Sequence, residues 1–181
     1  MKLLARLLGS AAFSALLIGL PIMAQGINID YNRSVDFKQL KSYSWQKIHA
    51  TDPQIEERIS AAVNRDLSSL ALNQVNGNAD LLITAVEATK NPQEYATFYN
   101  SLTGFTWRRG WNTHGFTDAI RSVRRIPLGT LVLDMYDGKT HQLLWRATVD
   151  EFVSTSAEKN DESMDKAINA MLDKFPPKYE K

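Results

Sequence analysis

The sequence of 181 residues contains no cysteine. Disulfides, thiol nucleophiles and cysteine-ligated metals or clusters are therefore excluded. Common catalytic motifs are missing as well, because no serine stands in a Gly-x-Ser-x-Gly turn and neither a Gly-x-x-x-x-Gly-Lys phosphate loop nor a His-Glu-x-x-His helix occurs. We expect a protein that is not an enzyme, with no catalytic residues, no metal site and no cofactor.

Neither sign of charge dominates. The chain has 21 basic and 20 acidic residues and a formal net charge of +1, which argues against a dedicated polyanion binder such as a nucleic-acid-binding protein. Hydrophobic residues make up 44% and charged residues 23%, close to the globular average, so a packed core is expected. Residues 27–175 contain no internal repeat and no Pro/Gly-rich linker, which indicates one domain over residues 27–177 and a short tail at 178–181.

Only one long apolar run is present, at residues 7–20. It follows Lys2 and Arg6 and ends at Pro21. About 14 residues are too few for the roughly 20 that span a bilayer, and the layout is that of a secretory signal peptide. Cleavage is expected after residue 24 or 26, and a retained membrane anchor is the alternative. Loss of residues 1–26 leaves 19 basic and 20 acidic residues, a net charge of −1.

The next part of the chain alternates between strand and helix patterns. Residues 27–31 alternate apolar and polar, as in a half-exposed strand, and residues 43–48 form a second extended piece. Thr51 and Gln54 fit a capping box for a helix, and Pro53 suits its first turn. The apolar side chains of that helix recur at helical spacing: Ile55, Ile59, Val63, Leu67 and Leu70.

The strand predicted at residues 79–88 is apolar on both faces, which indicates a central position in a sheet. Residues 129–136 and 142–153 flank an Asp-Gly turn and predict a β-hairpin. In its second strand, Trp145 is expected on one face with Leu143, Ala147 and Val149. The other face is expected to carry Leu144, Arg146, Thr148 and Asp150.

A final helix is predicted from about residue 157 to residue 175, before Pro176 and Pro177. Its apolar stripe consists of Met164, Ala167, Ile168, Met171, Leu172 and Phe175. Two such amphipathic helices can cover one face of a sheet. The predicted fold is therefore α+β, a single two-layer domain with a mostly antiparallel sheet of four to six strands and two helices packed on one face.

Several ordered blocks carry a family resemblance. They are residues 30–32 (DYN), 35–45 (VDFKQLKSYSW), 53–59 (PQIEERI), 79–83 (ADLLI), 129–137 (GTLVLDMYD), 143–146 (LLWR), 167–168 (AI) and 175–177 (FPP). In this order they resemble the bacterial envelope family DUF4136. The resemblance implies a secreted Gram-negative protein with a compact α/β fold and implies no activity. Members are often lipoproteins, whereas this chain lacks a lipobox cysteine, so we expect a soluble periplasmic member.

Two groups of residues were weighed as chemical sites. The acidic residues Asp134, Asp137, Asp150 and Glu151 surround the hairpin, and a glycosidase-like acid pair would use such residues. We favour ordinary cross-strand polar pairs, with Asp137 serving the turn. The three histidines, His49, His114 and His141, lie far apart at predicted loops or strand ends, so we interpret them as solvated rather than as metal ligands.

The segment 104–126 stands apart by charge. It carries five arginines and one acid, a charge of +4, against about −5 for the rest of residues 27–181. Arginine with tryptophan is typical of contact surfaces. The candidate partner-binding residues are Trp107, Arg108, Arg109, Trp111, Arg121, Arg124 and Arg125. The alternative, which we favour, is a β arm at 105–111 with an adjacent strand at 121–126 that only complete the sheet.

These expectations combine into a secreted, periplasmic, non-enzymatic envelope binding or assembly module. Its expected partner is an anionic envelope component or an envelope protein, with no nucleic acid and no membrane span after processing. A hydrolase of envelope polymers and a purely structural, stress-related periplasmic protein are the alternatives. The sequence does not predict the oligomeric state.

Overall fold

The computed structural model describes residues 26–87, 92–102, 129–150 and 157–177. The expected signal peptide through residue 25, the tail at 178–181 and the whole arginine-rich segment 104–126 lie outside these ranges. The elements follow in the order β1 (Ile27–Tyr31), η1 (Phe37–Gln39), β2 (Ser42–His49), α1 (Pro53–Ser69), β3 (Asn73–Gln74), β4 (Leu81–Glu87), α2 (Pro92–Leu102), β5 (Leu131–Asp137), β6 (Leu143–Val149) and α4 (Ala157–Leu172).

The strands form one open sheet in the order β1-β6-β5-β4-β2-β3. Neighbours pair antiparallel except around β2, which is parallel to both β3 and β4. The parallel pair β2/β4 needs a crossover, and α1 supplies it. The predicted α+β class with a mostly antiparallel sheet is therefore confirmed, as is the central position of β4.

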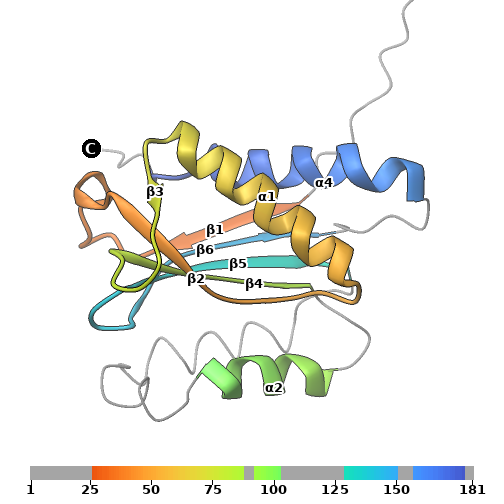
Figure 1. Ribbon diagram of the computed structural model, residues 1–181, viewed down its shortest axis with the longest axis horizontal. Helices are drawn as coiled ribbons and strands as arrows, with labels where there is room; N and C mark the ends of the chain where they lie inside the picture. Colours follow the sequence, from red (N-terminus) through yellow and green to blue (C-terminus); the bar gives the residue numbers. More distant parts are fainter. Residues whose placement is uncertain (1–25, 88–91, 103–128, 151–156, 178–181) are drawn as a thin grey trace, which may run out of the picture.

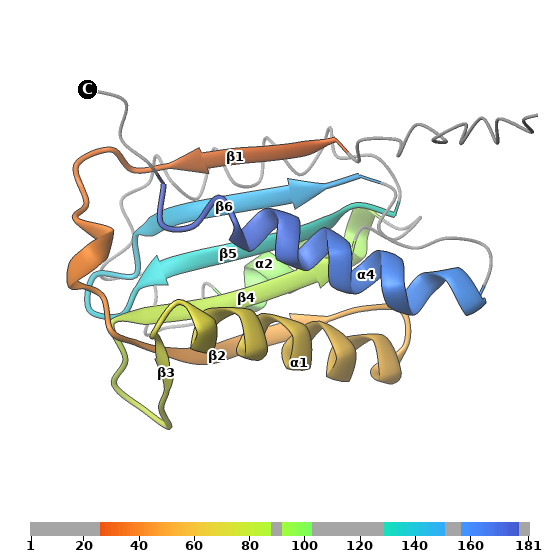
Figure 2. The same ribbon diagram turned by 90° about the horizontal axis from the view of Figure 1, so that it is seen from above.

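Helices α1 and α4 lie on one face of the sheet, here called the α1/α4 face (Figure 1). The main hydrophobic core lies between them and the sheet. It includes Ile59 and Leu67 of α1, Ile168 and Met171 of α4, and Trp145 of β6, all fully buried. Seen from above, the two helices run side by side across the strands (Figure 2). Burying one such apolar side chain stabilises the fold by roughly 1.5–3 kcal/mol.

Helix α2 lies on the opposite face, here called the α2 face (Figure 1). No helix was expected here, because residues 89 to about 126 lack clear apolar periodicity at their centre. Phe98, Tyr99 and Leu102 of α2 are buried, yet they do not belong to the main core cluster. They form part of a second, smaller interior on the α2 face of the sheet. No helix in the described ranges is both long and apolar enough to cross a membrane.

The start of α1 corrects the predicted capping box. Asp52 is the N-cap residue, and its side chain accepts a hydrogen bond from the backbone N–H of Gln54 at 2.8 Å. Thr51 instead donates from its backbone and its hydroxyl to Glu87 of β4, both at 2.9 Å. A carboxylate satisfies an unpaired N–H at the positive end of a helix. Pro53 at the first helical position is confirmed.

Two further details at helix ends differ from the sequence interpretation. Leu70, predicted in the apolar stripe of α1, is the C-cap residue and is 38% exposed. Helix α4 ends at Leu172 rather than at Phe175. Phe175 nevertheless packs in the core, with its ring edge-on to Trp145 at 5.5 Å between centroids. The chain therefore leaves the helix before its last core residue.

The β5/β6 hairpin is confirmed, and Gly138 in its turn is required for an unexpected reason. A Cβ on Gly138 would lie 1.8 Å from the carbonyl oxygen of Ala79, so no side chain fits there. The backbone of Gly138 instead donates to the carbonyl of Asp80 at 2.8 Å. The positive φ of this turn belongs to His141, at 59°. Glycine is needed because two backbones approach closely, rather than for a left-handed conformation.

A β-bulge changes one predicted face. The register places Met135 opposite Trp145 but Tyr136 opposite Leu143, so β6 has one extra residue there. Leu144 therefore joins Trp145 in the core on the α1/α4 face, and Leu143 lies on the face of Tyr136. The prediction that Leu143 and Trp145 share a face is wrong. The predicted burial of Trp145 is confirmed, since its side chain is fully buried.

Candidate functional site

A row of polar residues crosses the α2 face from one side of the sheet to the other. Successive cross-strand partners are Lys47 of β2, Thr84 of β4, Asp134 of β5, Arg146 of β6 and Asp30 of β1. Thr84, Asp134 and Arg146 are buried, whereas Asp30 at the edge is exposed. On the α1/α4 face, by contrast, the buried residues of these strands are apolar. We call these five residues the polar row.

The centre of the polar row is a bidentate ion pair. Arg146 donates from Nε to Oδ1 of Asp134 and from Nη2 to Oδ2, both at 2.6 Å. Tyr136 and Tyr99 donate their hydroxyl protons to the same Oδ2 at 2.9 and 3.0 Å. The Arg146 guanidinium also lies 5.7 Å from the centre of the Tyr99 ring. Both oxygens of Asp134 are thus engaged by donors from β5, β6 and α2.

Burial and the charge of Asp134 act in the same direction on the pKa of Tyr136 and in opposite directions on the pKa of Arg146. Burial raises the pKa of Tyr136 well above its ordinary value, and the neighbouring Asp134 charge raises it further. Burial, the largest single influence, would lower the pKa of Arg146, but the charge and hydrogen bonds of Asp134 and the two neighbouring tyrosines together hold that pKa above its ordinary value. The Tyr136 hydroxyl therefore stays protonated and the Arg146 guanidinium stays charged at ordinary pH.

One buried member of the polar row has no hydrogen-bond partner in the described part of the chain. The hydroxyl oxygen of Thr84 is buried and makes no hydrogen bond to a described residue. Its neighbours across the strands are Lys47 and Asp134, but the Asp134 oxygens face Arg146 and the tyrosines. A buried hydroxyl without a partner is destabilising. Thr84 is therefore a weak point in an otherwise satisfied network.

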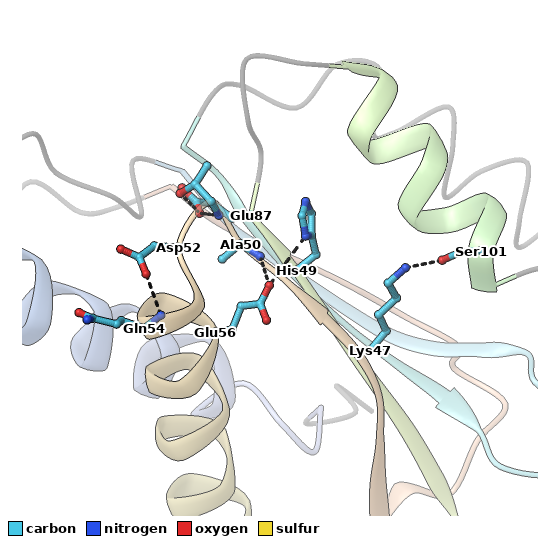
Figure 3. A network of polar contacts seen from close by, with 9 residues as sticks. Lys47, His49, Ala50, Asp52, Gln54, Glu56, Glu87 and Ser101 are labelled. Atoms are coloured by element: carbon cyan, nitrogen blue, oxygen red, sulfur yellow. Dashed lines mark hydrogen bonds and ion pairs between the residues drawn. The ribbon is translucent and has the colours of Figure 1, made fainter.

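A second cluster links the end of β2 to α1 and α2 (Figure 3). Lys47 Nζ donates to the Ser101 hydroxyl at 2.6 Å and lies 5.1 Å from the centre of the Phe98 ring. The His49 ring stacks on Phe98 at 6.3 Å, and its Nδ1 lies 3.8 Å from Glu56. These contacts hold one side of α2 against the sheet, as Figure 3 shows for Lys47 and Ser101.

The acidic residues weighed in the sequence do not meet as an acid pair in the described ranges. Asp134 is paired across the hairpin with Arg146, as cross-strand pairing predicts. Asp137 accepts from the backbone of Lys139 and Thr140 in the turn, and Asp150 accepts from the Thr130 hydroxyl at 2.9 Å. Glu151 lies outside the described residues. No group of three His, Asp or Glu side chains in the described part could hold a metal ion.

The two histidines in the described ranges lie in different parts of the fold. His49 ends β2, and His141 lies between β5 and β6. His114 lies outside the described residues, as do all seven candidate partner-binding residues: Trp107, Arg108, Arg109, Trp111, Arg121, Arg124 and Arg125. The structure therefore neither brings these seven together nor separates them, and their role stays a prediction.

The free edge of the sheet is the second candidate site. Within the described part of the chain, β1 pairs only with β6 (Figure 2). Asn32 N donates to Leu144 O at 2.8 Å, and Asp150 N donates to Gly26 O at 3.2 Å. In this antiparallel pair the even-numbered residues of β1 therefore bond to β6. The alternate residues Ile27 and Ile29 direct their backbone N–H and C=O groups away from the sheet.

A groove lies beside this edge on the α1/α4 face. Its volume is about 300 Å³, at the lower end of ligand-pocket sizes. The residues that line this edge groove are Ile29, Tyr31, Asp173, Lys174, Pro176 and Pro177. The lining combines apolar side chains with one acid and one base. Sequence reasoning missed this site because β1 and the end of α4 meet only in the folded protein.

Comparisons with known proteins agree with this fold. The model of the family described as domain of unknown function DUF4136 matches residues 27–177. No curated protein matches the chain. Among solved structures, a DUF4136 family protein from Bacteroides thetaiotaomicron aligns with a TM-score of 0.59 at 13% identity, over 84% of this chain and 96% of that one.

Two other solved structures are similar. A PDZ domain protein from Parabacteroides distasonis aligns with a TM-score of 0.55 at 15% identity, over 86% of this chain and 36% of that one. The PelC dodecamer from Paraburkholderia phytofirmans aligns with a TM-score of 0.46 at 9% identity, over 81% of this chain and 94% of that one. At these identities the similarity concerns the fold alone, and the PelC alignment is too weak to carry an argument.

Proposed function

The chain belongs to the DUF4136 family of domains of unknown function, and from its own residues we propose that it is a secreted, periplasmic, non-enzymatic binding module. Its binding site is the open edge of β1, where it receives an extended segment of an envelope protein. The periplasmic address rests on the signal-like residues 1–26.

The outward backbone groups of Ile27 and Ile29, which no strand in the described ranges pairs, are the observation that carries this proposal. Ile27 and Ile29 together offer two N–H and two C=O groups that β6 does not use. Unpaired strand edges are templates for another strand, and an extended peptide that adds to one gains main-chain hydrogen bonds. The edge groove gives side chains of that peptide a place to bind, which supplies specificity.

The buried cluster supports a scaffold role rather than catalysis. A carboxylate that acts as a general base must be able to take a proton from a substrate. Asp134 already accepts two bonds from Arg146 and two from the tyrosines, and its side chain is fully buried. The same bonds fasten α2 to β5 and β6. We therefore assign this cluster to fixing the rigid sheet that presents β1.

A second class of partner is supported by charge. The segment 104–126 carries +4 in a domain whose net charge is −1. Clustered arginines suit anionic lipid or polysaccharide head groups, because guanidinium pairs with phosphates and carboxylates in a bidentate manner. This attachment would position the protein at the envelope surface and would leave the β1 edge available. It is tested separately in the Discussion.

Crosslinking in the native host tests the edge. A photoreactive residue replaces Asn28, whose side chain is exposed on β1, and a matched probe replaces Glu57 on the exposed side of α1. We expect one specific adduct from the probe at position 28. The probe at position 57 should not form this adduct. Adding Ile29→Pro should remove the adduct, because proline has no N–H for an incoming strand and edge strands tolerate it.

The control is Ile29→Val, which keeps the outward N–H and should keep the adduct. An unchanged melting temperature in both variants shows that the fold is intact. If position 28 yields no adduct, or if Ile29→Pro leaves the adduct in place, the β1 edge is not the binding site and the proposed function is wrong.

A further inference from the structure

We propose that the strand received at this edge is β1 of a second copy of the same chain, paired antiparallel about a two-fold axis at Ile29. This inference rests on the proposed function and names the partner of the same site. The two six-stranded sheets would then join into one continuous sheet.

The direction of the backbone groups restricts how two β1 strands can meet. Outward-facing residues must lie opposite outward-facing residues, because only these carry the N–H and C=O groups that bond across. With the axis at Ile29, this residue faces the partner's Ile29, and the two exchange a pair of hydrogen bonds. Both Ile29 groups that this pairing needs are unused by β6.

The side chains of β1 are self-complementary in this register. On the α1/α4 face, Ile27 lies opposite the partner's Tyr31, and all these side chains are half-buried against the core. On the α2 face, Asp30 lies opposite the partner's Asn28, so that a carboxylate meets an amide. Aromatic and β-branched residues paired across strands stabilise a sheet, whereas like charges directly opposite one another destabilise it.

Other two-fold registers are less favourable. An axis at Asp30 places two carboxylates directly opposite each other. An axis at Asn28 moves Tyr31 beyond the paired region and places Asp30 opposite the partner's Gly26, which has no side chain. The axis at Ile29, in contrast, places the unused Ile29 groups of both copies opposite each other and opposes no like charges.

Charge at the rim of the edge groove also suits a second copy. The groove holds one acid, Asp173, and one base, Lys174. A two-fold axis brings the same surface of both copies together, so an acid on one copy can meet a base on the other. The domain as a whole carries only −1 after removal of residues 1–26, so long-range repulsion between copies is small.

The paired surface is small, and the dimer is therefore weak. Stable interfaces bury about 1,200–2,000 Å² in total, whereas β1 contributes five residues per copy. We expect a dimer that forms in a concentration-dependent manner. A covalent trap is the appropriate measurement, and the chain suits it because it contains no cysteine of its own.

Three single-cysteine variants test the register: Ile29→Cys, Asn28→Cys and Asp30→Cys. Opposed residues in a hydrogen-bonded antiparallel pair have Cα atoms about 5.5 Å apart, within the roughly 4.4–6.8 Å that a disulfide bridges. Residue 28 lies diagonally from residue 28 of the second copy, and residue 30 likewise from residue 30, with Cα atoms about 7–8 Å apart. Under a mild oxidant, Ile29→Cys should form disulfide-linked dimer at least about tenfold faster than the other two, since Cα separations beyond 7 Å are not bridged.

Sedimentation of variants without cysteine gives an independent readout. Wild-type protein and Ile29→Val should associate as concentration rises, and Ile29→Pro should remain a monomer. Equal crosslinking of all three cysteine variants, faster crosslinking of Asn28→Cys, or association that survives Ile29→Pro would overturn the inference. A position-28 adduct in cells whose mass shows a different protein overturns the self-pairing and leaves the edge-binding function intact. If position 28 forms no adduct at all, both the self-pairing and the edge-binding function are overturned.

Discussion

Arg146 and Asp134 form a bidentate pair that is almost sealed from solvent, with 8% and 0% of their side chains exposed. The two N–O distances are 2.6 Å. Tyr99 of α2, the helix on the α2 face, donates its hydroxyl proton to Asp134. This pair ties three separate elements together at one point. Single and double substitutions of this pair should therefore change the free energy of unfolding by very different amounts.

Removing one partner of the pair should be strongly destabilising. Arg146→Ala or Asp134→Ala leaves a buried charge unpaired and should lower the free energy of unfolding by about 3–5 kcal/mol. The double variant Asp134→Leu/Arg146→Met should recover most of the loss, because no buried charge remains. Chemical denaturation of the wild type and these three variants measures the losses and the recovery. A single variant that loses less than about 1 kcal/mol, as an exposed ion pair would, contradicts the burial of the pair.

Thr84→Val should stabilise the protein. The hydroxyl of Thr84 is buried without a hydrogen bond, and valine has nearly the same shape without the unsatisfied group. An increase of about 1 kcal/mol in the free energy of unfolding is expected, since an unpaired buried polar group costs about 1–3 kcal/mol. Thr148→Val, at a half-buried site on the same face, is the control and should change little. A destabilised Thr84→Val would show that the hydroxyl has a partner, such as a buried water.

Asp80 should contribute to stability at neutral pH and not in acid. It accepts hydrogen bonds from the backbone N–H groups of Lys41 and Ser42 and from the Ser42 hydroxyl. The Lys41 bond first, and then the Ser42 bonds, hold the pKa of Asp80 below its ordinary value. A lowered folded-state pKa gives stability that is present above the unfolded pKa of about 4 and is lost as pH falls through the folded value.

The comparison that checks this is wild type against Asp80→Ala over a range of pH. The stability difference should be full at pH 7 and should shrink below about pH 4. Ser42→Ala removes one donor while the carboxylate keeps its two backbone bonds, so it should lose less at pH 7. A difference between wild type and Asp80→Ala that is the same at both ends of the range would refute this account.

Reversal of three arginines should affect binding and not folding. Arg108, Arg121 and Arg124 changed to Glu should leave the melting temperature nearly unchanged, because surface substitutions usually stay within about 0.5 kcal/mol. The same protein should lose retention on lipopolysaccharide or anionic liposomes. Wild-type retention should weaken above about 0.15 M salt, where screening acts within roughly 8 Å. If the triple variant fails to fold, these arginines are structural and the β-arm interpretation is the correct one.

Processing should expose β1 close to the N-terminus. Protein isolated from the native host should begin at Gln25 or Ile27, as the small residues before these positions predict, and should fractionate with the periplasm. N-terminal sequencing and fractionation measure this. An intact Met1 terminus in the membrane pellet would show that the segment is a retained anchor.

The sequence was most informative where the chemistry is local. Alternation in residues 27–31, the periodic apolar side chains of α1 and α4 and the Asp-Gly turn of the hairpin each act over a few neighbours, and the structure confirms these elements. The predicted capping box failed for a tertiary reason. Thr51 and Asp52 are both good N-cap residues, and only the position of Glu87 on β4 decides that Thr51 bonds elsewhere.

By itself, the sequence determined the α+β class, most of the strands, and the apolar sides of α1 and α4, because periodicity fixes which side chains can be buried together. Tertiary structure alone decided what meets across the sheet. The bulge in β6 moved Leu143 off the core face, and the strand order placed Lys47, Thr84, Asp134, Arg146 and Asp30 in one row. Those five residues span positions 30 to 146, so no local pattern could bring them together. Ile29 lies at the edge of the sheet because, among the described strands, β1 pairs with β6 alone.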